Sequence, residues 1–269
     1  MKLVTFGDSW IYGDEILPDT IEYRNGVIIG GLIYKDFKFS KYINYANNGA
    51  SNERIALQIM EYKNSDNYSE DDFLVVGLTS PLRNLLYLNH GHAPLTLPSW
   101  DEMHIKTRKD SPSDSVYKDW FKKTGFYLTN NRNDLVRYAN NLFTIKSLLA
   151  SNKKYLVWQS IDDIHKIYDD VEMKGWNEVR LHWDDGNEFK EKDSKIFFDK
   201  EYIKKELSSN LEDTQVWINF NEPSWQTVLN KDVLLHGGVS EFMVLHHPNE
   251  KGHLFWYENF IKKYIKNIL

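Results

Sequence analysis

The chain has 269 residues, of which 41% are hydrophobic, and it contains no cysteine. This size supports one elaborated domain with a full core, and the lack of cysteine excludes disulfides and thiolate metal sites. The net charge of -6 argues against nucleic acid as a partner, since nucleic-acid binders concentrate basic residues. Because no apolar run is long enough for a signal peptide or a membrane helix, we expect a cytoplasmic protein with no membrane partner.

Five apolar, β-rich runs alternate with helical stretches along the chain. In order they are residues 2–6, 42–46, 73–78, 154–159 and 215–220. Between them, residues 52–62 and 134–149 have apolar side chains at helical spacing, and residues 249–269 form a predicted amphipathic helix. The alternation predicts an α/β fold with three layers, in which helices cover a doubly wound, five-stranded parallel sheet.

Two stretches, about 84–132 and 161–213, are too long to be simple connections of such a fold. Both are rich in aromatic residues, including Tyr87, Trp100, Trp120, Phe121, Tyr127, Trp176 and Trp183. Most of these rings are expected to anchor the insertions, and a minority to line a pocket. We therefore expect a single domain, residues 1–269, with two large insertions, the first of which partly covers the site.

Polar residues follow three of the predicted strands and precede the last helix. Ser9 follows the first strand within GDSW, NNGASNERI (47–55) follows the second, GLTSPLR (77–83) follows the third, and HHPNEKGH (246–253) precedes the helix. In a doubly wound fold the functional crevice lies at the carboxyl ends of the strands, so these loops can converge. A serine from one loop and a histidine from another make a nucleophile and its base.

These motifs resemble those of the SGNH, or GDSL-type, hydrolases. The resemblance rests on GDS at 7–9, on the Gly/Ser/Asn loop after the second strand and on HPNEKGH at 247–253, in that order. That family comprises esterases and acylhydrolases with a flavodoxin-like sheet. The resemblance implies Ser9 as nucleophile and His247 as general base of an ester hydrolase that needs no cofactor. Its expected substrate is a small-molecule or glycan ester.

The resemblance also implies an oxyanion hole, built from the backbone N–H of the serine, a glycine of the second motif and an asparagine of the third. Here Asn52 stands where the glycine is expected, with Gly49 three residues earlier, and Thr79 stands where the asparagine is expected. A backbone N–H needs no particular side chain, so Asn52 can still donate. Thr79 can donate only through its hydroxyl.

Two further residues complete the predicted binding site. Ser80, beside Thr79, is expected at the same crevice. Arg83 is either a substitute donor to the substrate or a surface arginine at the start of a helix, and the sequence leaves both open.

The acid of the expected triad is missing from its usual place. The family carries an aspartate three residues before the histidine, and this chain has Val244 there. Three alternatives remain: a serine–histidine dyad oriented by a backbone carbonyl or water, a carboxylate from elsewhere, or a protein that no longer hydrolyses anything. The carboxylates considered are Glu241, Asp232, Asp162 and Asp163. We prefer the carbonyl or water, because a distant carboxylate needs supporting contacts of its own.

Four histidines near the C-terminal end of the sequence can be considered as ligands of a metal ion: His236, His246, His247 and His253. Adjacent histidines point in different directions and no HExxH spacing is present, so we predict no metal site and assign His253 a structural role.

The alternative to an enzyme is a catalytically silent binding protein that holds a carbohydrate or a protein partner with its aromatic insertions. Turnover of an aryl ester or covalent labelling of Ser9 separates the two. Nine tryptophans suit sugar stacking and would equally suit a core, so a carbohydrate or glycoconjugate ester is one candidate, and the sequence does not name the substrate.

Overall fold

The computed structural model describes residues 1–80, 83–88, 91–96, 131–161, 200–218, 223–229, 241–244 and 247–269, with only the backbone described at 83–88, 91–96, 131–135 and 200–201. Its main sheet consists of β1 (Leu3–Phe6), β2 (Tyr42–Asn44), β3 (Phe73–Leu78), β6 (Lys154–Gln159) and β7 (Gln215–Trp217). The strands lie in the order β2-β1-β3-β6-β7, and every neighbouring pair is parallel. This is the order of the flavodoxin-like, doubly wound fold, which confirms the predicted fold class.

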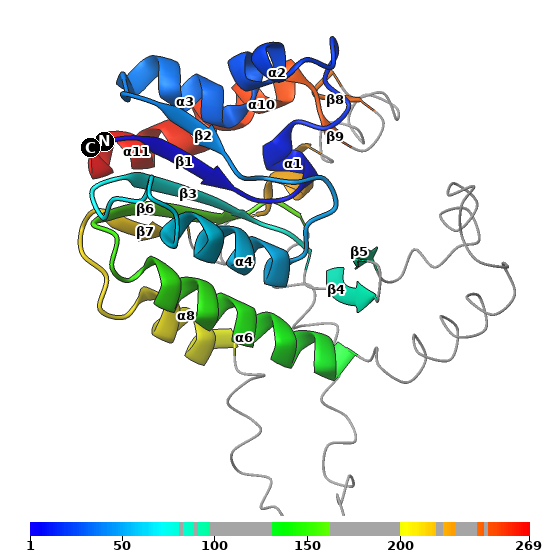
Figure 1. The fold of residues 1–269 in the computed structure, drawn as a ribbon, viewed down its shortest axis with the longest axis vertical. Coiled ribbons are helices and arrows are strands. Elements are labelled where there is room, and N and C mark those ends of the chain that lie inside the picture. Colours follow the sequence, from blue (N-terminus) through cyan, green and yellow to red (C-terminus); the bar gives the residue numbers. More distant parts are fainter. Residues whose placement is uncertain are drawn as a thin grey trace, which may run out of the picture.

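The sheet is covered by helices on both sides (Figure 1). One side carries α4 (Asn52–Lys63), α6 (Asn131–Leu149) and α8 (Lys200–Ser208). The other carries α1 (Ser9–Tyr12), α3 (Ile29–Phe37), α10 (Glu250–Trp256) and α11 (Lys262–Ile268), with the π-helical turn η4 (Tyr257–Ile261) joining the last two. The short helix α2 (Ile21–Val27) contacts α3 and α10.

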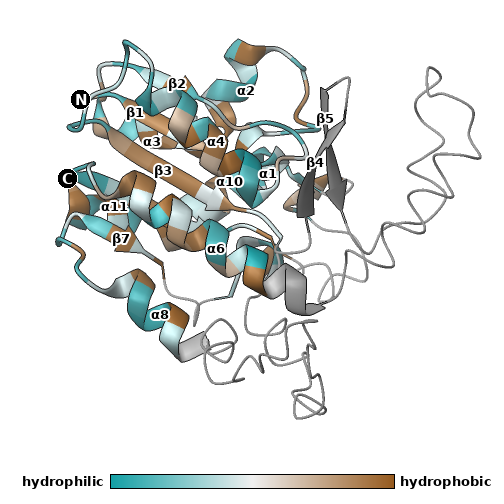
Figure 2. Cartoon of the chain, turned by 60° about the horizontal axis from the view of Figure 1, so that its bottom comes forward, coloured by the Kyte–Doolittle hydropathy of each residue, from teal (hydrophilic) through white to brown (hydrophobic). Residues whose placement is uncertain are grey.

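Alternate residues of each central strand enter the two cores. Val4 and Phe6 of β1 pack toward α4 and α6, whereas Leu3 of the same strand packs toward α3 and α11. The central strand β3 is buried at all six positions, and Figure 2 shows it as a hydrophobic band through the molecule. A strand buried on both faces explains why FLVVGL is apolar throughout rather than alternating.

The five predicted strands are all present, and three predicted helices correspond to α4, α6 and the α10–α11 segment. The sequence reading missed α1, α2 and α3. It also assigned residues up to 213 to the second insertion, and this boundary is wrong, because α8 packs into the same core as α4 and α6. The apolar face of α8 is short, with Ile203 and Leu207 as its buried anchors.

The first predicted insertion begins with an antiparallel hairpin of β4 (Arg83–Leu88) and β5 (Gly91–Thr96). Figure 1 shows this hairpin beyond the carboxyl ends of the parallel strands, the end of the sheet at which α1 begins. The aromatic side chains singled out in the two insertions lie outside the described side chains. The role of the first insertion as a lid therefore stays a prediction.

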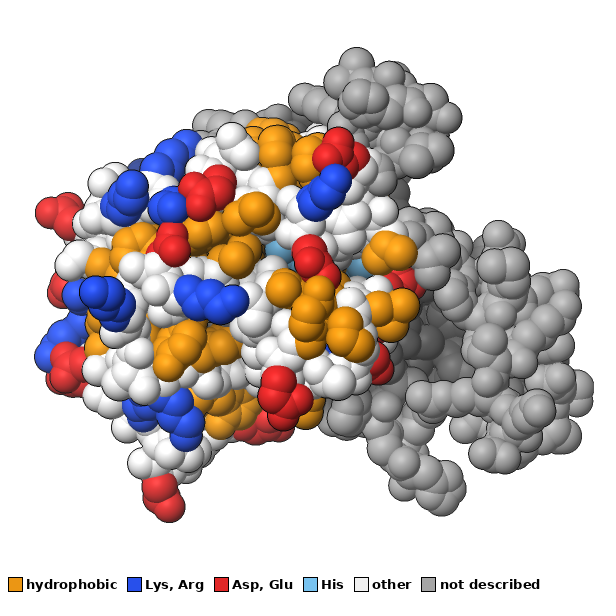
Figure 3. Space-filling model, turned by 90° about the horizontal axis from the view of Figure 1, so that it is seen from above, with side chains coloured by type: hydrophobic (Ala, Val, Ile, Leu, Met, Phe, Trp, Pro, Cys, Tyr) orange, Lys and Arg blue, Asp and Glu red, His pale blue; other side chains and the backbone are white. Residues whose placement is uncertain are grey.

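Basic and acidic side chains are interspersed, with apolar side chains between them, on the face made by α2, α3, α10 and α11 (Figure 3). Within the described ranges, none of the helices is both long enough and apolar enough to pass through a bilayer.

Candidate active site

Ser9 is held by a tight turn between β1 and α1. Asp8 caps α1 by accepting a hydrogen bond from the backbone N–H of Trp10 at 3.0 Å. The side chain of Gln58, from α4, bonds to both the N–H and the carbonyl of Gly7, at 3.3 and 3.4 Å. A Cβ on Gly7 would lie 2.4 Å from a carbon of Ile11, so only glycine fits where the chain turns. The turn therefore fixes the start of α1, and Ser9 is its first residue.

The loops after β2 and β3 are locked together and to this turn. The Asn52 side chain donates to the carbonyl of Thr79 and accepts from its N–H, both at 3.1 Å. The Thr79 hydroxyl in turn donates to Asp8 at 2.6 Å. All three side chains are buried. Three polar loops thus form one connected network that ends at Asp8, the residue before Ser9.

His247 is positioned by a second small sheet and by the cap of α10. The strands β8 (Met243–Val244) and β9 (His247–Pro248) pair so that Val244 faces His247. Asn249 then caps α10 by accepting from the N–H of Gly252 at 3.0 Å. A Cβ on Gly252 would meet the carbonyl oxygen of Phe242 at 2.3 Å. The HPNEKGH motif is therefore a strand end, a cap and a close-packed helix start, and it sets the direction of the imidazole.

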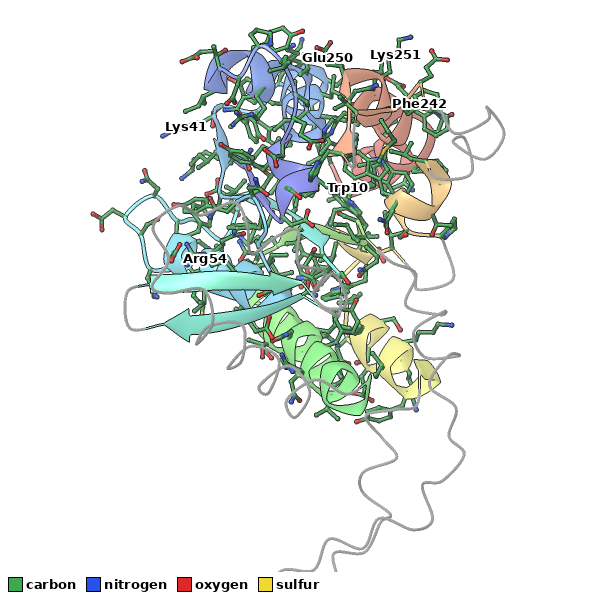
Figure 4. All side chains as sticks on the ribbon, turned by 90° about the vertical axis from the view of Figure 1, so that its right-hand side faces the viewer. Trp10, Lys41, Arg54, Phe242, Glu250 and Lys251 are labelled. Atoms are coloured by element: carbon green, nitrogen blue, oxygen red, sulfur yellow. The ribbon has the colours of Figure 1, made fainter. Side chains whose placement is uncertain are left out.

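The hydroxyl of Ser9 and the imidazole of His247 meet across 238 residues of sequence. The Ser9 Oγ to His247 Nε2 distance is 2.9 Å, within the range of about 2.6–4 Å expected for a nucleophile and its base. Ser9 is almost fully buried, and 16% of the His247 side chain is exposed. Figure 4 looks onto this edge of the sheet, with Trp10, the neighbour of Ser9, near the middle of the view and Phe242, Glu250 and Lys251 above it.

The other ring nitrogen of His247 faces a carboxylate. Glu15 Oε2 lies 2.9 Å from His247 Nδ1, and both atoms are buried. The oxygen lies off the line of the ring N–H bond, so the contact has the distance but not the direction of a hydrogen bond. Glu15 has a φ of 65°, in the left-handed region. Such a conformation costs a residue other than glycine about 1–3 kcal/mol, and it places this carboxylate at the imidazole.

The predicted oxyanion residues do not all point at the reacting pair. The Asn52 side chain bonds to the backbone of Thr79, and the Thr79 hydroxyl donates to Asp8; none of these contacts involves the backbone N–H of Asn52. Ser80 is buried directly after Thr79, and Gly49 lies in the turn before α4 with a φ of 69°. Arg83 lies in β4, so it begins a strand rather than the helix considered for it, and its side chain is outside the described set.

Among the carboxylates considered as the triad acid, Glu241 pairs with Lys251 at 2.8 Å instead. Asp162, Asp163 and Asp232 lie outside the described residues. At the second nitrogen of His247 the structure favours a carboxylate from elsewhere over the preferred backbone carbonyl or water, because Glu15 lies there. Glu15 was not among the carboxylates considered from the sequence.

His253 is a core residue. It is fully buried, accepts a hydrogen bond from the Ile29 N–H at 3.3 Å and meets the Trp225 ring edge-on at 4.9 Å. Burial lowers the pKa of His253 to about 3, and the neighbouring His247 contributes in the same direction. The part of the chain that the structure describes contains no group of three or more metal-binding side chains, and His236 and His246 fall outside it.

The strand order defines a doubly wound α/β protein, and the hydrogen-bonded Ser9 and His247 side chains lie at the carboxyl edge of its sheet. A solved structure of a member of the lipolytic protein G-D-S-L family from Veillonella parvula DSM 2008 is similar to the chain, with 12% identity, a TM-score of 0.45 and 97% of each chain covered. No family model and no curated protein matches the chain. At this identity and TM-score the likeness does not extend to activity or substrate, so the function is argued from the site itself.

Proposed function

We propose that the chain is a serine ester hydrolase with Ser9 as nucleophile and His247 as general base. The observation that carries the proposal is the 2.9 Å contact between Ser9 Oγ and His247 Nε2. Ser9 and His247 are far apart in sequence and are brought together by the turn at the start of α1 and by the cap of α10. The turn restricts the direction of the Ser9 side chain, and the cap restricts that of His247. A hydroxyl bonded to an imidazole at the carboxyl edge of a doubly wound sheet is an arrangement suited to nucleophilic catalysis.

In the first half of the reaction, His247 Nε2 takes the hydroxyl proton as Ser9 Oγ attacks the carbonyl carbon of the ester. The tetrahedral intermediate carries its negative charge on the former carbonyl oxygen. The backbone N–H of Ser9, at the first position of α1, has no acceptor within its own helix and can donate to this oxygen. Collapse breaks the bond to the alcohol, which leaves with the proton from Nε2, and an acyl group stays on Ser9.

In the second half, water replaces the alcohol. His247 takes a proton from the water, the hydroxide attacks the acyl carbon, and Ser9 recovers its proton as the carboxylic acid leaves. The network beneath the site contributes rigidity, because Asp8, Thr79 and Asn52 hold the loops that carry Ser9. A fixed nucleophile needs little reorganisation on the way to the transition state.

For the substrate we propose an acylated carbohydrate or glycoconjugate. The support is the aromatic content of the chain, because tryptophan and tyrosine rings stack on sugar faces. Four of the nine tryptophans are fully buried in the core and are unsuited to this role: Trp10, Trp158, Trp225 and Trp256. Any stacking rings therefore come from the remaining tryptophans, most of which belong to the two predicted insertions.

The proposal is tested by turnover of a short-chain aryl ester and of a panel of O-acylated sugars. Wild-type protein should release acid from the aryl ester, and Ser9→Ala should reduce the rate to that of the buffer. If Ser9→Ala hydrolyses the ester as fast as the wild type, Ser9 is not the nucleophile. If the aryl ester is cleaved and every acylated sugar is refused, the carbohydrate part of the proposal fails alone.

A further inference from the structure

We propose that Glu15 is the positioning carboxylate of this site and acts on His247 in place of an acid at Val244. The inference rests on the proposed function, since a positioning role needs a catalytic base to position. Its direct support is the 2.9 Å distance between Glu15 Oε2 and His247 Nδ1, on the side of the ring opposite Ser9. Both atoms are buried, and neither makes an aligned hydrogen bond to another described group.

The backbone explains how an acid so close to the nucleophile can reach the far side of the imidazole. The N–H groups of Gly13 and Asp14 both donate to the carbonyl of Ser9 at 3.0 Å, so α1 ends after one turn and the chain reverses. Gly13 ends the helix with a φ of 79°, and Glu15 follows with a φ of 65°. A left-handed glutamate is uncommon, and such residues persist where the surrounding structure imposes them.

The direction in which the Glu15 carboxylate faces Nδ1 is not rigidly fixed, because the last torsion of a glutamate side chain is soft. Catalytic hydrogen bonds are often poorly aligned before substrate binds and tighten afterwards. Glu15 keeps 26% of its side chain exposed, which leaves room for rotation about its last torsion.

The chemical role follows from the two ends of the imidazole. A carboxylate at Nδ1 keeps the ring proton on that nitrogen, so that Nε2 presents its lone pair to the hydroxyl of Ser9. When Nε2 takes up the second proton, the negative charge of Glu15 stabilises the resulting imidazolium. Val244, which faces His247 across the β8–β9 pair, can do neither, because its side chain accepts no hydrogen bond.

The first experiment compares Glu15→Gln with Glu241→Gln in turnover of a short-chain aryl ester. Glutamine keeps the size of the side chain but removes the charge, so kcat should fall by about 10²- to 10⁴-fold while KM changes little. Glu241 pairs with Lys251 on the surface, so Glu241→Gln should keep the wild-type rate.

The second experiment moves the acid. In an antiparallel pair, directly opposed residues have Cβ atoms about 5 Å apart, so an aspartate at position 244 can reach the ring of His247. The double variant Glu15→Gln/Val244→Asp should have a kcat at least about tenfold higher than that of Glu15→Gln alone. A role of Glu15 in folding alone would not be rescued by a carboxylate on a different strand.

The inference is overturned if Glu15→Gln keeps kcat within about twofold of the wild type while Ser9→Ala is inactive, and in that case the proposed function still stands. A fully active Ser9→Ala would instead remove the proposed function. Should Glu15→Gln fail to fold, nitrogen NMR of histidine-labelled wild type decides: the His247 proton is expected on Nδ1, and its presence on Nε2 refutes the role of Glu15.

Discussion

The side chain of Asn52 holds the loop after β3, whereas the oxyanion role expected for Asn52 uses its backbone N–H, which an alanine at this position keeps. Its amide makes two hydrogen bonds with the backbone of Thr79, both 3.1 Å long and both buried. Substituting Asn52→Ala leaves the buried N–H of Thr79 without its partner, whereas the carbonyl of Thr79 keeps the hydrogen bond from the Gln159 side chain at 2.9 Å. We therefore expect the main effect of this substitution on stability, with a loss of activity that follows from displacement of the loop.

The magnitude follows from the one orphaned group. A buried backbone group that loses its partner costs about 1–3 kcal/mol, so Asn52→Ala should lower the free energy of unfolding by about 1–3 kcal/mol. For a chain of this size, 1 kcal/mol corresponds to a shift of about 2–4 °C in Tm. The expected fall in Tm is therefore about 2–12 °C.

Urea and thermal unfolding, followed by circular dichroism, measure the effect. Asn64→Ala is the matched control, since Asn64 ends the same helix and is exposed, and it should change stability by less than about 0.5 kcal/mol. A loss of stability for Asn52→Ala no larger than that of Asn64→Ala would refute the structural role of the Asn52 side chain.

Two further substitutions test other parts of the account. Gly7→Ala would place a Cβ 2.4 Å from Ile11 and 3.0 Å from the carbonyl oxygen of Gly77, so we expect a loss of about 1–3 kcal/mol in stability and a displaced Ser9, measured by urea unfolding and ester turnover. An unchanged Gly7→Ala protein would show that the turn is not tightly packed. His253 has a pKa of about 3 in the folded protein against 6.5 when exposed, so the unfolded chain binds a proton that the folded protein excludes. The contribution of His253 to the free energy of unfolding is complete above pH 6.5, and it declines by about 1.4 kcal/mol per pH unit as the pH falls toward 3. His253→Gln should therefore flatten the dependence of unfolding free energy on pH in this range, and an unaltered slope would contradict the burial of His253.

The fold was predictable because the central strands are buried on both faces. FLVVGL and KYLVWQ are apolar without alternation, which is the mark of a parallel sheet covered on two sides. Helix α1 was missed because it has only four residues, too few to show a period. Helix α8 was missed because its two buried anchors stand among charged residues.

The residues of the candidate site could be predicted where a short motif fixes the local geometry. They could not be predicted where the contact joins residues far apart in sequence. GDS and HPNEKGH carry their own turn and cap, so Ser9 and His247 could be named from the sequence. The hydroxyl of Thr79, expected to donate to the substrate, instead donates to Asp8, whereas the backbone N–H expected to donate from Asn52 stays a prediction. Glu15 escaped because its contact with His247 depends on a left-handed backbone that sequence patterns do not reveal.

The central claim is that the hydroxyl of Ser9 is activated by His247. The most direct measurement is the reaction of the folded protein with a fluorophosphonate, followed by intact mass and peptide mapping. The account predicts a single adduct on Ser9, which is absent from Ser9→Ala and forms at least about 100-fold more slowly in His247→Asn. A folded wild-type protein that forms no adduct, or an adduct on Ser9 that forms at an unchanged rate in His247→Asn, would contradict it.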